Sequence, residues 1–133
     1  MRRDETGRRD EGGAPAVLLV EDNLAMRALI RSLVEEISPT IHECGDGASA
    51  IALYTRFRPD WVLMDITLER LDGIAATRAI RRLDPAARII IVTEHGDEAH
   101  RHAATAAGAC GFVLKENLLD LQLLLSDSRP ETS

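Results

Sequence analysis

The sequence predicts an α/β fold in which five parallel strands form a doubly wound sheet covered by helices on both faces. Short apolar runs alternate along the chain with segments whose apolar residues recur at helical spacing. This alternation is typical of a parallel sheet. Most of the runs are apolar throughout, as expected of strands buried on both faces. Right-handed crossovers between successive strands then give three layers.

The predicted elements follow one another from Ala16 onward. The expected strands are residues 17–20, 41–44, 61–64, 89–92 and 112–114, and all but the second are wholly apolar. The expected helices are residues 24–37, 48–57, 73–83, 98–107 and 118–125. Asp22 or Asn23 can cap the first helix, and Gly108 ends the fourth. Residues 16–126 therefore form one domain, between a disordered tail at 1–15 and a polar tail at 127–133.

Composition excludes several classes of protein. The apolar fraction of 45% over 133 residues suits a single soluble globular domain, and the net charge of -6 argues against direct nucleic-acid binding. No apolar run is long enough to span a membrane, and the N-terminal residues lack the apolar core of a signal peptide. Cys44 and Cys110 lack CxxC spacing, and apolar surroundings are expected for both. We expect a cytoplasmic protein with two reduced, buried thiols.

Polar side chains follow four of the predicted strands at the point where each strand ends. Glu21 and Asp22 follow the first strand, Asp65 the third, Thr93 the fourth and Lys115 the fifth. Ligands of open parallel sheets bind at this carboxyl edge, so these side chains are expected to converge. Lys115 is the only lysine among 16 basic residues, which suggests a position where the broad arginine fork does not fit.

This set of groups suits phosphoryl transfer. Clustered carboxylates need a hard cation, and Mg²⁺ prefers oxygen ligands. Asp65 is placed to attack a phosphoryl group, Lys115 to offset its charge and Thr93 to hydrogen-bond one of its oxygens. The product is an acyl phosphate, which hydrolyses readily and so suits a transient switch. Simpler roles stay open: Asp22 and Thr93 as helix caps, and Asp65 as a turn residue.

Four segments carry a family resemblance. The segments VLLVEDN, DITLERLDG, IIIVTE and GACGFVLKE, in this order between Ala16 and Leu125, resemble the signatures of bacterial two-component response-regulator receiver domains of the chemotaxis type. The resemblance implies a flavodoxin-like sheet with strand order 2-1-3-4-5. It also implies site residues: Asp65 as phospho-acceptor, Thr93 and Lys115 as its catalytic partners, Mg²⁺ or Mn²⁺ held by Glu21, Asp22, Asp65 and the Thr67 carbonyl, Thr93 and Phe112 as the switch, and Thr67, Glu94 and His95 as residues that tune hydrolysis.

The chain departs from the family pattern at four positions. Glu21 replaces the commoner aspartate, Glu69 stands where proline is common, and Glu94 stands where a small residue is usual. Glu116 replaces a proline that usually follows the lysine through a cis bond. Because a cis bond before another residue costs about 3 kcal/mol, a trans Lys115–Glu116 bond is expected.

The resemblance implies a stand-alone receiver that takes a phosphoryl group from a histidine kinase or histidine phosphotransfer protein. It would not be an enzyme beyond slow self-dephosphorylation. Phosphorylation would change the face formed by the fourth helix, fifth strand and fifth helix, which would bind a protein target or a second copy of the chain.

Other functions stay open. One is a pseudo-receiver that binds partners without phosphorylation, which Glu94 and Glu116 favour. Two others fit the residues less well. A dehalogenase-type phosphatase needs an acid where Thr67 stands, and a flavin protein needs a phosphate loop where EDNLAM stands. A metal site formed by His95, His100 and His102 lacks a matching fourth ligand.

Overall fold

The computed structural model describes residues 15–67 and 72–126 of the chain. Of the tails expected at residues 1–15 and 127–133, only Pro15 lies within the described residues, and the departure at Glu69 lies outside them. The predictions made for these positions therefore stay predictions.

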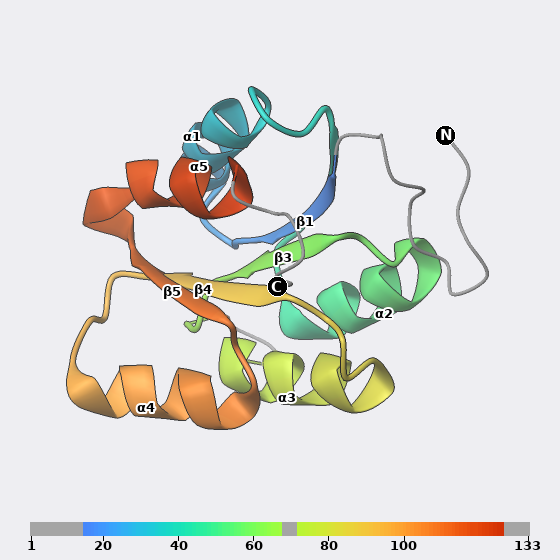
Figure 1. The fold of residues 1–133 in the computed structure, drawn as a ribbon, viewed down its shortest axis with the longest axis vertical. Helices are drawn as coiled ribbons and strands as arrows, with labels where there is room; N and C mark the ends of the chain where they lie inside the picture. The colour runs from blue at the N-terminus through green and yellow to red at the C-terminus, as the bar shows by residue number, and fades with distance from the viewer. Residues whose placement is uncertain (1–14, 68–71, 127–133) are drawn as a thin grey trace.

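Five parallel strands form one sheet in the order β2-β1-β3-β4-β5, as the resemblance implied (Figure 1). The strands are β1 (Ala16–Val20), β2 (Thr40–Cys44), β3 (Trp61–Met64), β4 (Ile89–Thr93) and β5 (Gly111–Leu114). Four of them match the apolar runs to within one residue at each end. The edge strand β2 is half-buried along its length, which agrees with its mixed polar sequence.

Helices cover both faces of the sheet. They are α1 (Leu24–Val34), α2 (Gly47–Phe57), α3 (Gly73–Leu83), α4 (Glu98–Ala107) and α5 (Leu119–Ser126). Figure 1 shows α1 and α5 on one face and α2, α3 and α4 on the other. Alternate residues of the central strands enter opposite cores, so Leu18 packs on the side of α2 and Leu19 on the side of α1. The fold class is confirmed: an α/β, flavodoxin-like arrangement of three layers.

Aspartate and asparagine caps fix the starts of three helices. Asn23 accepts a hydrogen bond from the Met26 amide, Asp46 from the Ser49 amide and Asp72 from the Ala75 amide, each at 2.8 Å. Asn23 rather than Asp22 therefore caps α1. The Asp22 carboxylate is consequently available for another role at the end of β1.

One helix is shorter than its apolar pattern predicts, and another begins and ends one residue later. α1 ends at Val34 rather than Ile37, because the chain turns toward Ser38 and Pro39, and a residue before proline disfavours helical geometry. Lys115–Asn117 forms a 3-10 turn, so α5 begins at Leu119. Among the described helices none has more than 11 residues, and none is long and apolar enough to cross a membrane.

The prediction of two buried thiols is wrong. Cys44 is half-buried at the end of the edge strand, and Cys110 is exposed in the turn before β5. Each residue lies where the sheet or its connection meets solvent. Burial still raises the pKa of the Cys44 thiol to about 11, from an ordinary value of 9.0.

We therefore expect Cys44 to react with iodoacetamide at pH 8 about 100-fold more slowly than a free cysteine, because its thiolate fraction is lower by that factor. Peptide mapping by mass spectrometry after timed labelling measures this rate. Protein unfolded in guanidinium is the control, and there Cys44 should react at the ordinary rate. Fast labelling of Cys44 in the folded protein would contradict the burial seen here.

Candidate acidic site at the carboxyl edge of the sheet

Strand register brings the predicted acidic residues together. Val20 of β1 pairs with Met64 of β3, so the residues that follow them, Glu21 and Asp65, leave neighbouring strands side by side. The Asp65 amide also donates to the Val20 carbonyl at 3.1 Å. On the other side of the site, Thr93 of β4 pairs with Leu114 of β5. Lys115 is therefore the first residue after β5, and its side chain can extend over the carboxyl edge of the sheet.

Lys115 joins two buried carboxylates. Its Nζ atom lies 2.9 Å from Glu21 Oε1 and 3.2 Å from Asp65 Oδ2. The side chains of Glu21 and Asp65 are 1% and 3% exposed, and that of Lys115 is 10% exposed. Two carboxylates held this close, away from water, require a compensating cation. A compact ammonium meets both of them, which gives a physical reason for a lysine here.

Burial and neighbouring charges shift the pKa values of Glu21 and Lys115. The pKa of Glu21 is raised because burial disfavours its charged form, although Lys115 and the Asn23 amide, which donates to Oε2 at 3.1 Å, act in the opposite direction. Burial alone would lower the pKa of Lys115, but the nearby carboxylates of Glu21 and Asp65 raise it on balance. Lys115 therefore stays charged across the physiological pH range.

The three acids form a cluster that suits a hard cation. Carboxylate oxygens of Glu21, Asp22 and Asp65 all lie within 4.8 Å of one another. Asp22 is exposed whereas the other two are buried, so the cluster has a deep side and a side open to water. Mg²⁺ prefers such oxygen ligands and keeps several waters, so the donors present fit this ion. In the described part of the chain no histidine belongs to a cluster of this kind, which leaves the three-histidine site without support.

Asp65 is held at both of its oxygens. Oδ2 meets Lys115, and Oδ1 accepts from the Thr67 amide at 3.2 Å and the Thr67 hydroxyl at 3.3 Å. Thr67 therefore contacts the proposed acceptor, while the role of its carbonyl as a metal ligand stays a prediction. This arrangement orients the carboxylate without covering Thr67, which is exposed.

Gly73 also belongs to the site, although its position in the sequence predicted only the start of a helix. A Cβ atom placed on Gly73 would lie 1.9 Å from the carbonyl oxygen of Asp65 and 2.9 Å from Cα of Ile66. The Gly73 amide also donates to the Ile66 carbonyl at 2.9 Å. The first residue of α3 therefore packs directly on the backbone of Asp65. One signal in the sequence is that a glycine begins the helix that follows β3 and Asp65.

The predicted switch residues lie on the neighbouring strands β4 and β5. Thr93 is fully buried, and its hydroxyl accepts a hydrogen bond from the His95 amide at 3.2 Å. Phe112 is half-buried against the core that α2, α3 and α4 cover. Glu94 and His95 are exposed in the connection to α4, and the His95 ring stacks on His100 with centroids 4.8 Å apart. These positions are compatible with the predicted switching and tuning roles, which stay predictions.

The connection after Lys115 is trans, as expected from Glu116. Among residues 15–67 and 72–126 no peptide bond is cis. Glu116 is exposed in the 3-10 turn, and Lys115 nevertheless reaches both carboxylates. A trans bond at Lys115–Glu116 is therefore compatible with contact between the ammonium group and both carboxylates.

Comparisons with known proteins agree with this geometry. A family model described as the response regulator receiver domain matches residues 17–125. Over 102 residues the chain is 40% identical to the chemotaxis protein CheY of Halobacterium salinarum, covering 77% of this chain and 85% of that protein. It is 37% identical over 103 residues to CheY of Bacillus subtilis, with coverages of 77% and 86%. A crystal structure of a LuxR-family two-component response regulator from Aurantimonas superposes with a TM-score of 0.78 at 35% identity, covering 88% of this chain and 89% of that one.

Proposed function

The chain belongs to the response regulator receiver family, and from that premise we propose that it is a phosphorylation switch whose acceptor is Asp65. The observation that carries the proposal is the buried contact of Lys115 with Glu21 and Asp65, beside the exposed Asp22. Burying three charged groups has a desolvation cost, so their retention here points to a functional role. Phosphoryl transfer supplies that role.

In the proposed step a carboxylate oxygen of Asp65 attacks the phosphorus of a phosphohistidine on a kinase or phosphotransfer protein. The new P–O bond forms as the P–N bond breaks, and the electron pair stays on the imidazole nitrogen. Lys115 offers its charge to the phosphoryl oxygens, and the Thr93 hydroxyl, whose oxygen accepts from the His95 amide, donates its own proton to one of them. Hydrolysis by water reverses the mark, releasing phosphate and restoring the Asp65 carboxylate.

The acidic cluster would hold Mg²⁺, or Mn²⁺, through Glu21, Asp22 and Asp65. When bound, the ion offsets negative charge on the transferring group. The chain's own contribution is to hold Asp65 in one orientation through Thr67 and Lys115 and to keep its deep side dry. Asp22 leaves the other side open for a donor to approach.

Phosphorylation would change partner binding by shifting a pre-existing equilibrium between a resting and an activated conformation of the domain. The rearranged surface would be the face formed by α4, β5 and α5, which would bind a target protein in the cytoplasm or a second copy of the chain. Phe112 is half-buried on β5, and β5 pairs with β4, the strand that ends at Thr93. A change at the Thr93 hydroxyl can therefore reach this face through short contacts.

The test is intact-protein mass spectrometry after incubation with Mg²⁺ and acetyl phosphate or phosphoramidate. We expect one phosphoryl adduct on the wild-type chain and none on Asp65→Asn or in EDTA. Wild type and Asp65→Asn should have similar circular dichroism spectra, which controls for folding. Absence of the adduct from the wild type with each donor would contradict the proposal and favour a pseudo-receiver that binds partners without phosphorylation.

A further inference from the structure

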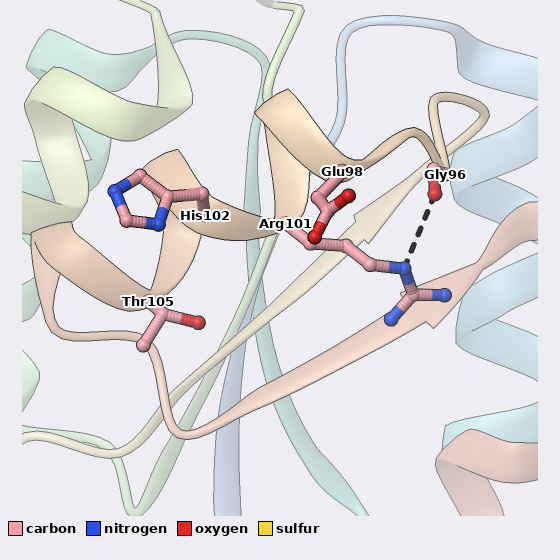
Figure 2. A pocket seen from close by; sticks show the side chains of 5 residues that line it. All are labelled: Gly96, Glu98, Arg101, His102 and Thr105. Atoms are coloured by element: carbon pink, nitrogen blue, oxygen red, sulfur yellow. Dashed lines mark hydrogen bonds between the residues drawn. The ribbon is translucent and has the colours of Figure 1, made fainter.

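Arg101 makes two contacts that connect separate parts of the proposed switch. Its guanidinium carbon lies 4.5 Å from the centre of the Phe112 ring, which places a cation over an aromatic face. Its Nε atom donates to the Gly96 carbonyl at 3.2 Å (Figure 2). One exposed side chain of α4 thus contacts both β5 and the connection between β4 and α4.

Gly96 belongs to the segment that the Thr93 hydroxyl organises. Thr93 accepts from the His95 amide, and Gly96 follows directly. Gly96 also packs closely on β5, because a Cβ atom at this position would lie 2.8 Å from Leu114 Cδ2. A chain of short contacts therefore runs from Thr93 through the His95–Gly96 backbone to Arg101 and Phe112.

Phe112 lies between this arginine and the core. Its inner side packs against the core under α4, and its outer side meets Arg101. Beside them is an open hollow of about 480 Å³ lined by Gly96, Glu98, Arg101, His102 and Thr105. Any inward movement of the ring would separate it from the guanidinium, so the contact favours the position seen here.

We propose that Arg101 is a positioning residue that holds Phe112 in the resting position and couples its release to the Thr93 hydroxyl. This inference rests on the proposed function. When the Thr93 side chain turns to donate its hydroxyl proton to a phosphoryl oxygen, its oxygen moves away from the His95 amide, and the Gly96 carbonyl that follows is free to shift. Arg101 then loses one of its two anchors, and the ring is released inward. Arginine suits this role because its Nε–H and its planar face can bond to different groups at once.

The chain offers a clean probe and a matched control. It contains two phenylalanines, Phe57 and Phe112, so fluorophenylalanine labelling gives two ¹⁹F resonances that Phe57→Leu assigns. Arg88 makes the same pair of contacts at the other end of the sheet. Its guanidinium carbon lies 4.1 Å from the Trp61 ring centre, and its Nε donates to the Asp60 carbonyl at 3.2 Å. Arg88→Met therefore removes equivalent chemistry far from the switch.

The experiment follows the Phe112 resonance during titration with beryllofluoride and Mg²⁺, a stable mimic of the phosphoryl group. In unliganded Arg101→Met we expect the resonance to move toward its beryllofluoride-bound position in the wild type. The midpoint of the titration should fall about threefold to tenfold, the range of a partly exposed cation–π contact. Arg101→Lys keeps the charge without the Nε donor, so its midpoint should lie between those of the wild type and Arg101→Met. Arg88→Met should have the midpoint of the wild type.

The outcomes separate this inference from the proposed function. A responsive wild type whose Phe112 resonance and midpoint are unchanged in Arg101→Met would overturn the inference alone. The same change in Arg88→Met would overturn it too, because the effect would then be general destabilisation. A wild-type resonance that beryllofluoride leaves unmoved would contradict both the coupling and the proposed function.

Discussion

Gly73→Ala is expected to lower the free energy of unfolding by about 3 kcal/mol and to slow phosphoryl incorporation at Asp65. The added methyl would lie 1.9 Å from the Asp65 carbonyl oxygen, a distance that forces the β3–α3 backbone to move. Helix propensity alone predicts the opposite sign, since alanine is favoured over glycine by up to about 1 kcal/mol. Urea unfolding and the initial rate of acetyl phosphate labelling measure the two effects.

Gly45→Ala is the matched control for this substitution. A Cβ atom at Gly45 would lie 2.9 Å from the Arg27 side-chain nitrogen Nη2, the far end of a flexible chain that can move aside. We expect a loss below about 1 kcal/mol and normal labelling. Equal stabilities for the two alanine variants would show that Gly73 does not fix the position of Asp65.

Lys115→Ala is expected to destabilise the protein by about 3 kcal/mol without Mg²⁺, because Glu21 and Asp65 would lose their shared cation in a buried site. Labelling with acetyl phosphate should slow by about 100-fold or more, since no other described cation is seen to contact Asp65. Urea unfolding and timed mass spectrometry provide the measurements. Mg²⁺ should restore more stability to this variant than to the wild type, because the uncompensated carboxylates would attract it more strongly.

Lys115→Arg tests whether charge alone is enough. Arginine keeps the positive charge but replaces a compact ammonium with a planar fork, which cannot occupy the same point between two carboxylates. We expect most of the stability to return while labelling stays well below that of the wild type. Full labelling activity in Lys115→Arg would contradict the argument that this solitary lysine is a geometric requirement.

The fold was predictable because local patterns and the sheet agree. Apolar runs marked four strands, and a polar residue ended each element that contributes to the site. Parallel strands place those residues at one edge, so the sequence alone predicts that Glu21, Asp65 and Lys115 lie together. Helix ends were less certain, since α1 stops where tertiary contacts and Pro39 redirect the chain.

The remaining features depend on distances that sequence spacing does not contain. The close approach of Gly73 to Asp65 arises from how α3 docks on the sheet. The Arg101–Phe112 contact joins residues of different elements, and nothing in the pattern of α4 marks Arg101 among its polar residues. The prediction of two buried thiols was wrong for the same reason, because exposure at an edge strand or a turn depends on how the elements pack.

The central claim is that Asp65 itself receives the phosphoryl group, and borohydride trapping tests it most directly. Borohydride reduces an aspartyl phosphate to homoserine, which marks the modified residue permanently. Trypsin should release residues 57–70, a peptide that contains both Asp60 and Asp65, and fragmentation distinguishes the two. We predict homoserine at position 65 only, in samples treated with Mg²⁺ and phosphodonor. Homoserine at Asp22 or Asp60, or none in a sample that carries the adduct, would contradict the account.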